Sequence, residues 1–100
     1  MMNGFVVDVR LTFTPAGVVD PDALRGSVAR ALGCACEVAG MPGGTVEILT
    51  RLDVGAASAA DARTRAVARA LGVTCGAGMF ARLGVRDVRA EATAVRGVGA

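Results

Sequence analysis

The chain has 100 residues, a net charge of +2 and a hydrophobic fraction of 53%. A chain of this length forms one domain, and charged residues interrupt every apolar stretch before the ~20 residues that a membrane span needs. The sequence has no Lys, His, Trp, Tyr or Gln, so the side chains that most often act as general acids, bases and nucleophiles are scarce. We therefore expect a single domain over residues 1–100 that is not an enzyme, carries no cofactor and does not span a membrane.

The beginning of the sequence and its cysteines bear on the compartment. Residues 1–5 carry no basic segment, and Asp8 and Arg10 interrupt the apolar positions that follow, which disfavours a secretory signal. The three Cys then predict reduced thiols rather than a disulfide framework. We expect a cytoplasmic protein.

The first predicted elements are a strand and a helix. Apolar and polar residues alternate from Phe5 to Phe13, as in a strand with one buried face. Asp20 followed by Pro21 predicts a helix start, and Gly33 stands where a C-terminal glycine would end that helix. Its apolar line is spaced by four residues: Leu24, Val28 and Leu32.

The next elements are a hairpin and a second helix. A short strand from Cys34 to Val38, a turn at 41–44 and a strand over 45–54 predict two antiparallel neighbours. Ser58 with Asp61 resembles a capping box, and the pattern predicts that this helix runs to Leu71 before Gly72.

An internal repeat relates the two halves of the chain. A shift of 39 residues superposes residues 28–33 on the identical segment 67–72, so that Val28 matches Val67 and Cys36 matches Cys75. We interpret residues 5–40 and 44–77 as a pseudo-repeat, with a further strand at 85–95 after a long connection. The repeat by itself predicts the last strand at 73–77, but the cleaner alternation over 85–95 favours the later segment. Residues 79–83 are predicted to form a helical turn within the connection.

This order of elements predicts an α+β fold. Two β-α-β units joined by a hairpin give the β-α-β-β-α-β order of the ferredoxin-like two-layer sandwich, with a four-stranded antiparallel sheet and two helices on one face. The resemblance is to an architecture and not to a family.

The candidate chemistry is sparse. Cys34 and Cys36 suggest a thiol or soft-metal site. The absence of His and the expected distance of Cys75 from the pair favour ordinary core cysteines instead. We therefore expect all three thiols to be protected and no metal to be bound.

The outward positions of the sheet carry alternating charges, among which Arg10, Arg51 and Arg89 are candidates for binding on the open face, although solvation explains most of the pattern. Nucleic acid is not an expected partner, because Phe5 and Phe13 share the parity of the buried face.

Three functions follow from these observations. The leading hypothesis is a non-enzymatic protein-interaction or assembly module. The alternative is a regulatory small-molecule binder of the ACT-like type, with which Gly17 and residues 20–24 are compatible, and the third is a thiol or metal-handling protein using Cys34 and Cys36.

We also expect a homodimer and leave a protein partner open. The edge strand at 85–95 is long, and its inward side is made of small residues that cover little area. The predicted interface residues are Met79, Phe80, Leu83 and Val88. The competing interpretation is that Phe80 covers the chain's own core.

Overall fold

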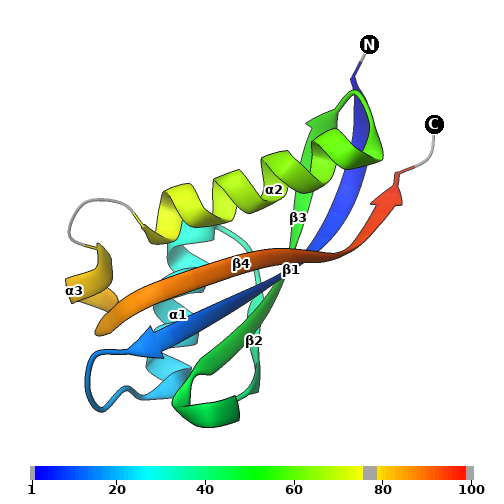
Figure 1. Cartoon of the computed structure of the whole chain (residues 1–100). Coiled ribbons are helices and arrows are strands. Elements are labelled where there is room, and N and C mark those ends of the chain that lie inside the picture. Colours follow the sequence, from blue (N-terminus) through cyan, green and yellow to red (C-terminus); the bar gives the residue numbers. More distant parts are fainter. Residues whose placement is uncertain (1, 76–78, 99–100) are drawn as a thin grey trace.

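The computed structural model describes residues 2–75 and 79–98, which form an α+β fold with a four-stranded antiparallel sheet and two main helices (Figure 1). In chain order the elements are β1 (Asn3–Pro15), α1 (Pro21–Leu32), β2 (Cys36–Gly40), the 3₁₀ turn η1 (Pro42–Gly44), β3 (Val46–Ala56), α2 (Ala59–Thr74), α3 (Met79–Leu83) and β4 (Val85–Gly97). The strands lie in the order β2-β3-β1-β4. The predicted antiparallel sheet with two main helices is confirmed.

The alternation in the sequence separates a covered face of the sheet from an open face. Strand β1 lies at the centre, and all three of its inward positions from Val9 to Phe13 are fully buried. Residues of α1 and α2 belong to the same core as these strand residues, so both helices cover one face of the sheet (Figure 1). The opposite face carries the polar residues of the alternation, and neither α1 nor α2 covers it (Figure 1).

Helix α1 forms as the sequence predicts. The Asp20 carboxylate accepts a hydrogen bond from the Asp22 backbone N–H at 3.1 Å, and Pro21 occupies the first helical position. Gly33 ends the helix in the left-handed conformation, with φ 70°. The buried residues of the helix are the three predicted ones, Leu24, Val28 and Leu32.

Helix α2 differs from the prediction in its end and in its buried stripe. The helix passes through Gly72 and ends at Thr74, so the predicted end at Leu71 is wrong. Thr74 is fully buried, and its hydroxyl donates to the Ala70 carbonyl at 2.7 Å, which extends the helix–sheet contact by one turn. The buried residues are Ala62, Ala66, Ala70 and Thr74, whereas Val67 is only half-buried. The repeat therefore misplaces the buried face of this helix by one residue.

The last strand lies at the later of the two predicted segments, 85–95, and not at 73–77. Val73 and Thr74 belong to α2, which overturns a strand at 73–77 for its first two residues, and residues 76–78 lie outside the described part of the chain. Helix α3 covers the predicted turn at 79–83 and leads directly into β4. β4 is an edge strand of 13 residues, while the other edge strand, β2, has five.

Candidate functional site

Most polar side chains of the sheet lie on its open face, and charged ones of the central strands form ion pairs with one another. Asp8 of β1 lies directly opposite Arg51 of β3 in the register, and Arg51 Nε donates to the Asp8 carboxylate at 2.8 Å. This hydrogen bond raises the pKa of Arg51 above its ordinary value. The guanidinium of Arg51 is thus already engaged by a carboxylate of its own chain.

Arg10 lies at the centre of a second set of ion pairs. Its Nε donates to Glu91 of β4 at 2.8 Å and lies 3.6 Å from the Glu47 carboxylate of β3. The bond to Glu91 is the main cause of a raised Arg10 pKa, and the charges of Glu91 and Glu47 add to it. Arg10 therefore bridges three strands, and its charge is balanced on both sides.

Arg89 is the least engaged of the three predicted arginines. Its side chain is 86% exposed, and its Nε lies 3.8 Å from the Asp87 carboxylate on the same strand. Such a pair on an exposed surface contributes only about 0–1 kcal/mol. Of the predicted open-face cations, Arg89 is thus the one available to a partner.

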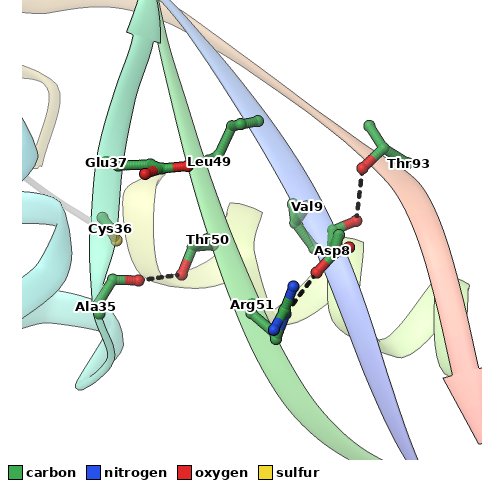
Figure 2. A pocket seen from close by; sticks show the side chains of 9 residues that line it. All are labelled: Asp8, Val9, Ala35, Cys36, Glu37, Leu49, Thr50, Arg51 and Thr93. Carbon is green, nitrogen blue, oxygen red and sulfur yellow. Dashed lines mark hydrogen bonds and ion pairs between the residues drawn. The ribbon is translucent and has the colours of Figure 1, made fainter.

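Two hollows mark the open face, and they divide the predicted arginines between them. The larger has a volume of about 510 Å³ and is shown in Figure 2; its lining residues are Asp8, Val9, Ala35, Cys36, Glu37, Leu49, Thr50, Arg51 and Thr93. The smaller, of about 330 Å³, brings Arg10 and Arg89 together with Thr12, Ala90 and Glu91. The three arginines therefore do not form one anion site.

Sequence reasoning placed Leu49 at an outward position of the sheet but did not include Thr93 among the open-face candidates. Thr93 is the extra residue of a bulge, because Asp8 pairs with Ala94 while Val9 pairs with Ala92. Its hydroxyl donates to the Asp8 carbonyl at 3.3 Å, across the rim of the larger hollow (Figure 2). Leu49 supplies an apolar side chain on the same face. An apolar residue at an outward position was the only sequence signal for this hollow.

The predicted interface residues lie against the chain's own core. Leu83 and Val88 are 6% and 7% exposed and belong to the core itself, while Met79 and Phe80 are half-buried and pack against it. The interpretation in which Phe80 covers the core of its own chain thus agrees with the packing. A second copy that contacted this region would therefore meet the backbone and the outward side chains of β4.

The cysteines separate into a pair and a single exposed residue. Cys34 and Cys36 are half-buried next to Thr50, whereas Cys75 caps α2 and is exposed. The expectation that all three thiols are protected is therefore wrong for Cys75. Because α2 runs to Thr74, Cys75 lies at a helix end and not on the strand that the repeat predicts.

Comparisons with protein-family models, with curated proteins and with solved structures give no significant match to this chain. Within residues 2–75 and 79–98, no three or more His, Cys, Asp or Glu side chains gather as metal ligands. No helix in the described part of the chain combines the length and apolar character of a membrane span.

Proposed function

We propose that this chain is a non-enzymatic assembly module that joins a second copy of itself through the free edge of β4. The observation that carries the proposal is the length of that edge: 13 residues, against the five or six of an ordinary strand. An edge strand offers a row of backbone N–H and C=O groups to another strand. A homodimer in which two β4 strands pair antiparallel would satisfy these groups in both copies at once.

The charges of β4 suit pairing with itself. A two-fold axis at Ala90 places Arg89 of one copy opposite Glu91 of the partner subunit, and the same pair occurs a second time by symmetry. Each opposite-charge pair across two strands contributes about 0.2–1 kcal/mol. Both side chains lie on the exposed side of the strand, and Ala90 at the axis is small enough to meet its own copy.

The lack of an obvious catalytic group supports a role other than catalysis. Arg10, Arg51 and the carboxylates around them are bound to one another on the open face, so they are poorly placed to transfer protons or to hold an anion. The only serines are Ser27, which lies within α1, and Ser58, which caps α2. Neither has a His or Lys partner in this sequence to activate it.

Light scattering after size exclusion tests the dimer. At micromolar concentration the protein should have about twice the monomer mass, and Arg89→Glu should weaken the dimer roughly fivefold to thirtyfold by placing like charges opposite each other. The double variant Arg89→Glu with Glu91→Arg restores opposite charges across the two-fold axis. It should recover only part of the loss, because Glu91→Arg also removes the carboxylate that binds Arg10 of the same chain. Arg30→Glu on α1 makes the same charge change away from β4 and should leave the mass unchanged. A wild-type monomer throughout this range would contradict the proposal.

We also infer that the fold is the ferredoxin-like β-α-β-β-α-β sandwich. Supporting this are the strand order β2-β3-β1-β4 and the succession of β1, α1, β2, β3, α2 and β4 along the chain. The turn η1 and the short helix α3 are additions to that plan. A crystal structure of the protein would test the strand order directly.

The second candidate function is small-molecule binding of the ACT-like regulatory type. The observation in its favour is the larger hollow, whose volume of about 510 Å³ suits a small ligand. The hollow lies over β1, β2 and β3, away from Gly17 and residues 20–24 where the sequence placed such a site. Native mass spectrometry distinguishes the candidates, because a retained small molecule favours the binder and a bare dimer favours assembly.

A further inference from the structure

Cys34 and Cys36 both lie beside Thr50 of β3, Cys34 through its thiol and Cys36 through the strand register. Gly33 turns the chain out of α1 with φ 70°, which places Cys34 in the bend before β2. Cys36 begins β2 directly opposite Thr50 in the register. Thr50 is an inward residue of β3, so the two thiols meet at the edge of the covered face, between α1 and the sheet.

Hydrogen bonds fix this arrangement. Cys34 Sγ lies 3.1 Å from Thr50 Oγ1, and the Thr50 hydroxyl donates to the Ala35 carbonyl at 3.0 Å. Because that hydroxyl has one proton, the Cys34 thiol is the donor in its contact with Thr50. The Cys36 thiol donates to the Cys34 carbonyl at 3.7 Å. Both sulfur atoms are therefore held in place, and within residues 2–75 and 79–98 no further His, Asp or Glu gathers with them as a third ligand.

The exposure of the two cysteines allows an ion to reach them. Cys34 and Cys36 are half-buried beside the edge strand β2, and of the two only Cys36 also lines the larger hollow, which lies on the open face (Figure 2).

We infer that Cys34 and Cys36 form a two-coordinate binding site for Cu(I). Soft thiolates select this ion, and two sulfur ligands at positions i and i+2 suit its low coordination number. On binding, two S–H bonds break, both protons pass to solvent and two Cu–S bonds form, while copper remains Cu(I). The resulting site has a net charge of −1. This inference does not depend on the dimer.

Anaerobic competition against bicinchoninate, with ascorbate keeping the copper reduced, tests the site. The wild type and Cys75→Ser should each retain one Cu(I) per chain, whereas Cys34→Ser and Cys36→Ser should lose it to the competitor. Cys75→Ser is the matched control, since it removes a thiol outside the pair.

A second measurement on the wild type needs no variant that must fold. Cu(I) should protect Cys34 and Cys36 from N-ethylmaleimide and leave Cys75 reactive, which peptide mass spectrometry reports residue by residue. Failure of the wild type to retain copper against the competitor would overturn the site. So would equal protection of all three thiols, or copper retained by Cys34→Ser.

Discussion

The two halves of the molecule, β1–α1–β2 and β3–α2–β4, begin alike and end differently. Each helix starts with a side-chain cap, from Asp20 in one half and Ser58 in the other. The halves also contain the same six residues, at 28–33 and 67–72. Yet Gly33 ends α1, while Gly72 lies inside α2, which continues to Thr74. The same six residues thus end one helix and continue the other, and the difference comes from their tertiary surroundings.

The packing of the helices explains this difference. α1 contacts the sheet through Leu24, Val28 and Leu32, and β2 follows at once after Gly33. α2 instead presents alanines at every fourth position, and the stripe continues to the buried Thr74. The last turn of α2 is held by tertiary contact, which outweighs the preference of Gly72 for a helix end.

The largest difference between the halves should appear at the two valines that the repeat equates. Val28→Asp buries an unpaired charge in the core and should cost more than about 4 kcal/mol, enough to abolish folding. Val67→Asp changes a half-buried residue and should cost about 1 kcal/mol. Thermal melts followed by circular dichroism measure both. Equal losses at the two sites would mean that Val67 is a core residue after all.

The alanine stripe of α2 should tolerate little added volume. Ala66→Leu places three more carbon atoms between α2 and the sheet, where Ala66 is fully buried, and should cost about 1–3 kcal/mol. Ala68→Leu makes the same change on the exposed side of the helix and should stay within about 0.5 kcal/mol of the wild type. Urea unfolding gives both values. A large loss with Ala68→Leu would indicate a different orientation of the helix.

The two equivalent glycines should respond with opposite signs. Gly33→Ala forces a side chain onto a residue with φ 70° and should cost about 1 kcal/mol. Gly72→Ala adds a good helix former inside α2, where the new Cβ has open space, and should stabilise by about 0.5–1 kcal/mol. Denaturant midpoints measured side by side show the signs. Destabilisation by Gly72→Ala would place that glycine at a helix end.

Local patterns in the sequence predicted most of the fold. Alternation located β1, β3 and β4, and capping residues located the start of both main helices. The end and rotation of α2 were not predictable this way, because alanine occurs on every side of that helix and gives no apolar stripe to read. Contact with the sheet, a long-range property, selects Ala62, Ala66 and Ala70.

The candidate site was less predictable than the fold. Arg10, Arg51 and Arg89 do lie on the open face, but their pairing depends on the register between strands, which the sequence did not specify. The pairing of Cys34 with Thr50 likewise depends on β2 beginning opposite the middle of β3. Thr50 interrupted the apolar pattern of its strand, and that interruption was the local sign of a buried polar residue on the covered face.

The smallest expected difference between the halves concerns the cysteines that the repeat equates, Cys36 and Cys75. Burial raises the pKa of Cys36, so the folded chain holds this proton more tightly than the unfolded chain does. The resulting stability is complete below the pKa of the unfolded thiol and is lost as the pH rises through the folded value. With no Lys or Tyr in the sequence, few other groups titrate in the same alkaline range.

Melting temperatures from neutral to alkaline pH should therefore fall slightly more in the wild type than in Cys36→Ser, whereas Cys75→Ser should follow the wild type. Alkylation by iodoacetamide provides an independent measure, because the exposed Cys75 should react before Cys36 at neutral pH. Faster alkylation of Cys36 would mean that its thiol is neither shielded nor held in the protonated form. Cys36 and Cys75 would then have similar environments, as the repeat by itself implies.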